Sequence, residues 1–151
     1  MVLSSIRMAI VVIGISAMSV LHAHPAGNLV VTGENVFWSY IYPTDDPNHH
    51  ACVMIWDGQS SPASLLVSDF PASNYLISAD GETVYIIERK YLHSTDLYEA
   101  RIWRRSATGE LRLIWDWFQD QFRIGDAGFF MENERVIIFG KYPGIYRLEQ
   151  G

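Results

Sequence analysis

Carboxylate and imidazole side chains gather in two short polar segments of this 151-residue chain. Neutral imidazole and carboxylate groups are both ligands of divalent metals, and histidine changes its charge near neutral pH. The spacing matches no recognised ligand motif, however, and Asp-Asp-Pro-Asn is typical of a solvated turn. We therefore predict ligand-binding loops without a metal centre or cofactor. The residues concerned are Asp45, Asp46, His49, His50, His93 and Asp96.

A dense aromatic segment, residues 115–122, is the second place where a ligand could bind. Aromatic rings give a sugar or a peptide a broad contact surface, and the neighbouring Asp and Gln side chains can hydrogen-bond a polyol. Packing between sheets also needs large rings, and Trp115, at the end of an alternating strand, fits that role. Trp117 enters the next connection, so we add it to the candidate ligand-binding residues.

One strand carries a basic cluster around a tryptophan. Alternation along an extended strand puts Arg101 and Trp103 on one face, opposite Ile102. We expect this face to be solvated, with the guanidinium partly stacked on the indole, and not to be an anion site.

Composition and motifs exclude several functional classes. The chain has 17 acidic and 11 basic residues, a formal net charge of −6 and a pI near 5.2, which argues against nucleic acid as a partner. Its one cysteine, Cys52, rules out an internal disulfide, and the apolar run around it predicts burial. The sequence contains no Ser-His-Asp order, glycine-rich phosphate loop, HExxH or CxxC pattern.

The amino-terminal residues are typical of an export signal. A basic start is followed by an uncharged apolar run from Met8 to Leu21, which is shorter than the roughly 20 apolar residues that span a membrane. We predict a signal peptide over residues 1–23 and a mature chain over 24–151, secreted or periplasmic. Retention of the segment as a membrane anchor is the alternative, and only then would a membrane be a partner.

The rest of the chain reads as short strands separated by Gly, Asp, Asn and Pro turns. Eleven such strands fall into groups of four, four and three. Matching positions recur at a nearly constant distance: Val36 to Val84 is 48 residues and Ile55 to Ile102 is 47. A period of this length is typical of propellers and related repeat arrays.

The turn and strand from Ser78 to Tyr85, Ser-Ala-Asp-Gly-Glu-Thr-Val-Tyr, resemble β-propeller repeats of the TolB-like and YVTN-like kind, in which Pro usually stands where Ala79 does. The resemblance implies about two and three-quarter propeller blades, an incomplete ring, and says more about architecture than activity. The same residues are also similar to a sialidase Asp-box, although Gly81 directly follows Asp80 and Tyr85 replaces the tryptophan.

Together these patterns predict an all-β fold of consecutive four-stranded antiparallel meanders, partly propeller-like, with a Greek-key β-sandwich as the alternative. The predicted function is an exported, non-catalytic binding or interaction module for a protein or a carbohydrate. Unpaired edge strands also make a homo-oligomer possible. A hydrolase-like propeller enzyme and a truncated product without independent activity are the alternative interpretations.

Overall fold

The computed structural model describes residues 28–41, 50–71, 73–124 and 128–151. The predicted signal peptide, residues 1–23, lies outside this part of the chain. Among the described residues, no helix is long and apolar enough to cross a membrane.

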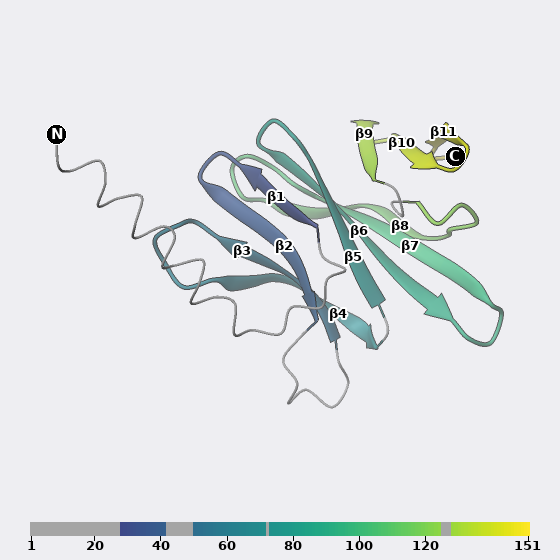
Figure 1. The fold of residues 1–151 in the computed structure, drawn as a ribbon, viewed down its shortest axis with the longest axis horizontal. Coiled ribbons are helices and arrows are strands. Elements are labelled where there is room, and N and C mark those ends of the chain that lie inside the picture. The colour runs from purple at the N-terminus through teal and green to yellow at the C-terminus, as the bar shows by residue number, and fades with distance from the viewer. Residues whose placement is uncertain (1–27, 42–49, 72, 125–127) are drawn as a thin grey trace, which may run out of the picture.

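Eleven strands form three separate antiparallel sheets, and neighbours in every sheet are consecutive in the chain (Figure 1). The first sheet contains β1 (Leu29–Thr32), β2 (Asn35–Ile41), β3 (His50–Trp56) and β4 (Ala63–Pro71). The second contains β5 (Ser73–Asp80), β6 (Thr83–Leu92), β7 (Leu97–Arg105) and β8 (Leu111–Gln119). The third contains β9 (Phe129–Asn133), β10 (Val136–Lys141) and β11 (Gly144–Glu149). The predicted meanders are therefore confirmed, whereas a Greek-key sandwich would require non-consecutive neighbours.

The first hairpins of the first two sheets are equivalent. Each has a two-residue turn that begins with a glycine at positive φ, +55° at Gly33 and +57° at Gly81. This left-handed conformation suits glycine and matches the twist of the flanking strands. Val36 and Val84 are consequently the second residues of β2 and β6, which confirms the 48-residue equivalence expected from the sequence. The expected equivalence of Ile55 and Ile102 is wrong by two residues, because Arg104 holds the position in β7 that Ile55 holds in β3.

The second sheet lies between the other two, and its strand β6 is buried on both faces. Along β6, Val84 and Ile86 pack with residues of the first sheet, whereas Tyr85 and Ile87 pack with residues of the third. Val84, Ile86 and Ile87 have no exposed surface. A strand covered on both sides favours consecutive apolar residues over an alternating pattern, as residues 84–87 of β6 show.

Polar side chains tie the sheets to one another at their first strands. The Asn28 side chain accepts a 3.0 Å hydrogen bond from the Ile77 amide of β5 and donates one to the Ile77 carbonyl. Thr32 Oγ1 donates to the Gly81 carbonyl over 2.7 Å. Strand β5 contacts β1 on one side and β9 on the other. The first strands of the three sheets are thus neighbours in chain order.

Cys52 is fully buried in β3, as the sequence predicts. Desolvation raises the pKa of its thiol to about 11. The thiol is therefore protonated at neutral pH and lacks the thiolate that reactive cysteines need.

Candidate functional site

We use the name rim for the end of the molecule at which β4, β6 and β8 finish and β3, β5 and β7 begin. Asp45, Asp46 and His49 belong to residues 42–49, outside the described part of the chain, so their proximity to the second polar segment stays a prediction. His50 is the first residue of β3, opposite Pro71, and is partly buried.

The second polar segment forms the turn between β6 and β7. The Tyr91 hydroxyl donates a hydrogen bond to the Asp96 carboxylate, which raises the pKa of Tyr91. The His93 ring lies edge-on to Tyr91, with centroids 4.7 Å apart. Asp96 has a φ of +57°, so it shapes the turn as well as accepting this bond. The described residues contain no group of three or more His, Cys, Asp or Glu that could hold a metal ion.

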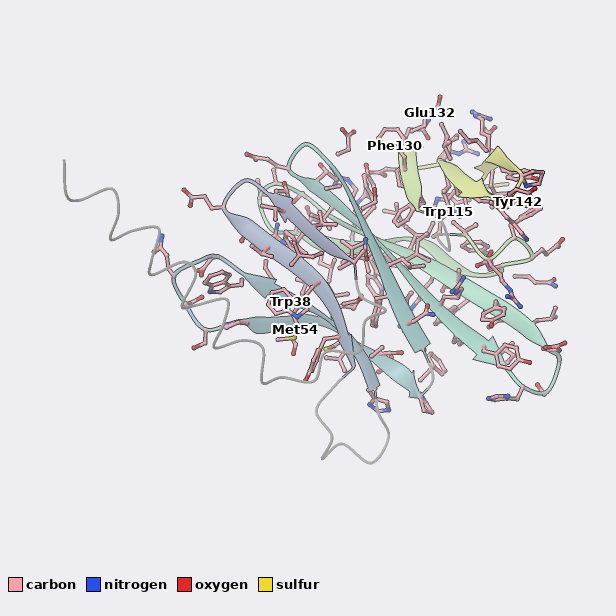
Figure 2. The ribbon with its side chains drawn as sticks, in the orientation of Figure 1. Trp38, Met54, Trp115, Phe130, Glu132 and Tyr142 are labelled. Atoms are coloured by element: carbon pink, nitrogen blue, oxygen red, sulfur yellow. The ribbon has the colours of Figure 1, made fainter. Side chains whose placement is uncertain are left out.

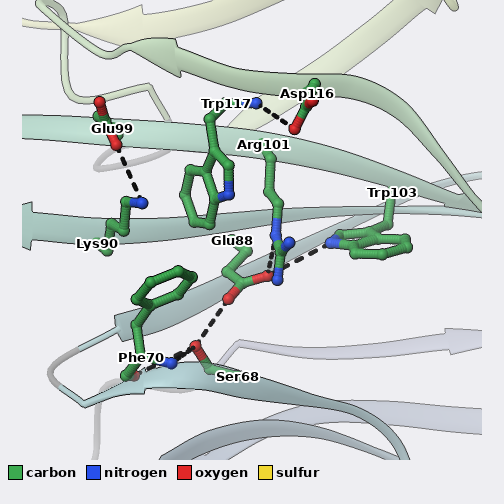
Figure 3. Close-up of polar contacts among 9 residues, drawn as sticks. All are labelled: Ser68, Phe70, Glu88, Lys90, Glu99, Arg101, Trp103, Asp116 and Trp117. Carbon is green, nitrogen blue, oxygen red and sulfur yellow. Dashed lines mark hydrogen bonds and ion pairs between the residues drawn. The ribbon is translucent and has the colours of Figure 1, made fainter.

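Trp117 lies at the rim, and its ring makes cation–π contacts with Lys90 and Arg101 (Figure 3). Lys90 Nζ is 3.8 Å from the indole centroid, and the Arg101 guanidinium carbon is 4.6 Å from it. Phe70 of the first sheet meets Trp117 edge-on at 5.5 Å, and Lys90 Nζ lies 4.1 Å from the phenyl centroid. Glu99 completes the group with a 3.1 Å ion pair to Lys90. Trp117 therefore joins two sheets through internal contacts.

We expect Lys90→Met to lower the free energy of unfolding by about 1–2 kcal/mol, because the variant keeps most of the apolar stem and loses two partly desolvated cation–π contacts. Urea unfolding measures the change. Lys141→Met, in the β10–β11 hairpin, is the matched control, since its ammonium has no ring or carboxylate partner among the described residues. Equal effects of the two substitutions would contradict the role assigned to Lys90.

A buried carboxylate lies next to this group. Glu88 has no exposed surface, and its two oxygens accept hydrogen bonds from opposite sides (Figure 3). Ser68 Oγ of the first sheet donates over 2.7 Å, and Arg101 Nε donates over 2.6 Å with a longer 3.4 Å contact from Trp103 Nε1. Tyr75, opposite Glu88 in β5, has its pKa raised above the usual range by desolvation and by this carboxylate.

The solvated face expected for Arg101 and Trp103 is therefore wrong, whereas the expected stacking is confirmed, with the Arg101 guanidinium carbon 5.1 Å from the centroid of the Trp103 ring. The Arg101 side chain is 13% exposed and lies between the first and second sheets, where it is paired with Glu88. Alternation placed both residues on the same face correctly, but the first sheet covers that face. The charge of Arg101 is therefore already paired within the protein.

A pocket of about 230 Å³ lies between the second and third sheets. It adjoins the end of β8, the turn at residues 120–124 and the last strand. Asp120 holds the turn: its amide donates to the Tyr98 carbonyl, and its carboxylate accepts the Ile124 amide at 3.0 Å. The lining residues are Trp115, Asp116, Phe118, Gln119, Asp120, Gln121, Phe122, Ile124, Leu148, Glu149, Gln150 and Gly151.

Strand β11 runs beside this pocket with one edge open. Among the described strands it pairs with β10 alone, whereas the equivalent third strands β3 and β7 each pair on both sides. The two-residue turn between Lys141 and Gly144 makes these two residues a hydrogen-bonded pair, so every second residue of β11 bonds to β10. The 2.8 Å hydrogen bond from the Gln150 amide to the Arg135 carbonyl fits this alternation of bonded and non-bonded pairs. The backbone groups of Ile145, Arg147 and Glu149 therefore point away from β10.

Comparison with known proteins finds no match for this chain among protein-family models, curated proteins or solved structures.

Proposed function

We propose that this protein is a non-catalytic interaction module that receives an extended segment of another protein along β11. The observation that carries the proposal is the row of outward backbone amides and carbonyls on β11 beside a pocket. An open strand edge is a template for pairing with another chain, and main-chain hydrogen bonds supply affinity in such complexes.

The pocket supplies the selectivity. An extended segment directs every second side chain to the same side, so one of them would enter the space lined by Trp115, Phe118 and Phe122. The exposed Asp116 and Glu149 stand at the same pocket. We therefore expect the segment to carry an apolar residue flanked by a basic one, in keeping with the acidic balance of the chain.

The cellular setting of this module follows from the sequence-based prediction of export. We propose that residues 1–23 direct the chain out of the cytoplasm, so that its partner is secreted or periplasmic. We also propose kinship with propeller repeats, supported by the serial order of the sheets and the equivalent hairpins of the first two.

The test uses a fluorescent synthetic peptide that copies Leu111–Gln119, the strand that occupies the equivalent position in the second sheet. Arg147→Pro removes one outward amide from β11, at a position where proline leaves the bonds to β10 intact. Arg147→Ala is the matched control, because it loses the same side chain and keeps the amide.

We expect saturable anisotropy binding by the wild type, at least tenfold weaker binding by Arg147→Pro, and binding within threefold of wild type by Arg147→Ala. Thermal unfolding verifies that both variants fold. Absence of saturable binding by the wild type, or equal weakening in the two variants, would overturn strand pairing at β11.

A carbohydrate is the second candidate ligand, favoured by one observation: the Phe122 ring is 39% exposed and lines the pocket beside Gln119, Gln121 and Asp116. A pyranose stacks on such a ring while amides and carboxylates bind its hydroxyls. Calorimetry with cellohexaose, maltohexaose and chitohexaose distinguishes the two ligands. Sugar binding would be lost in Phe122→Ala and retained in Arg147→Pro.

A further inference from the structure

The stack of three sheets ends in two outward faces that carry half-buried and exposed apolar side chains. Figure 2 shows Trp38 and Met54 on the first sheet and, at the opposite end of the stack, Phe130 of the third. We name these surfaces the outer face of the first sheet and the outer face of the third sheet. Exposed apolar surface of this kind marks interaction sites in soluble proteins.

The outer face of the first sheet is made of aligned apolar rows. Leu29, Trp38 and Met54 are direct cross-strand partners on β1, β2 and β3. Val31 projects from β1 on the same side as Leu29, and these two side chains are 63% and 64% exposed. Val30, between them, points the other way and packs into the core with the second sheet.

The same row exists, buried, in the second sheet. Ile77, Ile86 and Trp103 are cross-strand partners on β5, β6 and β7, and they follow Leu29, Trp38 and Met54 by 48, 48 and 49 residues. This second row packs against the first sheet. The outer face of the first sheet therefore corresponds to the face of the second sheet that the first sheet covers.

The outer face of the third sheet supplies the opposite half of that contact. Ile138 is the third residue of β10, as Tyr85 is the third residue of β6, and Tyr85 packs against the following sheet. Phe130 pairs with Ile138 across the strands and is 43% exposed. Ile145 of β11 is 80% exposed. Phe130 and Ile145 are therefore exposed among the described residues, whereas Ile138 is half-buried. Arg147, the cross-strand partner of Ile138, lies on the same face and is paired with Glu132 and Glu149.

We propose that two copies of this chain associate head to tail, the outer face of the third sheet of one copy packing on the outer face of the first sheet of the other. The contact would repeat the one made twice within each copy, where a sheet buries the outward residues of the sheet before it. A second copy is the partner we infer because each chain carries both halves of this repeating contact. The association uses sheet faces and so extends beyond strand pairing at the β11 edge.

Because the proposed contact joins two different faces, each face can be disrupted separately. Leu29→Arg places a charge on the outer face of the first sheet, and Ile145→Arg places one on that of the third. Leu97→Arg is the matched control, because Leu97 begins β7 at the rim, is 38% exposed and belongs to neither face. Mass is measured by light scattering after size exclusion, with circular dichroism to confirm folding.

We expect the wild type and Leu97→Arg to show at least twice the monomer mass at micromolar concentration, and each face variant alone to be monomeric. An equimolar mixture of the two face variants should form a one-to-one dimer, because each retains the half that the other lacks. A monomeric wild type, a face variant with unchanged mass, or a mixture that stays monomeric would overturn head-to-tail association.

Discussion

Glu88→Ala is expected to lower the free energy of unfolding by about 3–5 kcal/mol, which is a large share of the stability of a domain of this size. The substitution removes a fully buried carboxylate that accepts from Ser68 and Arg101. The Arg101 guanidinium would then lie between two sheets without its counter-charge, and the Ser68 hydroxyl would lose its acceptor. Urea unfolding followed by tryptophan fluorescence measures the loss.

Two comparisons separate the buried charge from a general effect of truncation. Glu99→Ala removes a carboxylate from the same sheet that is 32% exposed, and its cost should stay below about 1 kcal/mol. Glu88→Met combined with Arg101→Met replaces both charges with apolar groups and should be much milder than Glu88→Ala alone. A double variant as unstable as the single one would show that the ion pair is not the cause.

Trp115→Ala is expected to cost a similar 3–5 kcal/mol, because it opens a cavity in the core between the second and third sheets. Trp115 is 3% exposed, its ring meets Phe118 at 5.3 Å, and its Nε1 donates to the Glu134 carbonyl over 2.6 Å. Trp115→Phe keeps most of the ring and loses the donor, so about 1–2 kcal/mol is expected. Differential scanning calorimetry measures both.

Trp56 provides the matched control for this prediction. Its Nε1 also donates to a backbone carbonyl, that of Ser60, over 2.8 Å, but the contact stays within the β3–β4 connection and does not join two sheets. Trp56→Ala should cost about 1 kcal/mol. If Trp56→Ala matched Trp115→Ala, the link between the second and third sheets would not explain the loss.

The fold was predictable because it is specified locally. Turn residues such as Gly33 and Gly81 stop one strand and start the next within a two-residue loop, and sequential pairing then follows from the short connections. The sequence therefore predicted all eleven strands and their grouping by four, four and three. The strand ends were less predictable: the apolar pattern predicts a strand over Thr83–Glu88, whereas β6 continues to Leu92.

The polar contacts between sheets were not predictable in the same way. Glu88, Lys90 and Arg101 lie on strands in which charge indicates a solvated face, and only the position of the first sheet shows that this face is covered. The sequence placed Trp117 in the connection after its strand, whereas it lies within β8, and Lys90, its closest cation, is 27 residues away in sequence. Contacts between separate sheets produce no local pattern in the sequence from which the two partners could be predicted.

The sequence drew attention to one wall of the pocket without predicting the pocket itself. Residues 115–122 stood out as an aromatic segment with interspersed carboxylates and amides, and most of them line it. Its other wall comes from Leu148–Gly151, whose sequence carries no signal for the distant segment that it faces. A pocket between two strand edges depends on how two sheets pack, which the residues of either strand alone do not determine.

Strand β6 of the middle sheet is buried on both faces, and this determines the order in which the protein opens. Strands β1 and β11 can detach singly, whereas β6 gains access to solvent only after a whole flanking sheet has left. Its amide hydrogens should accordingly exchange with deuterium at the rate of global unfolding. The most persistent structure of this protein thus lies midway along the chain, far from either terminus.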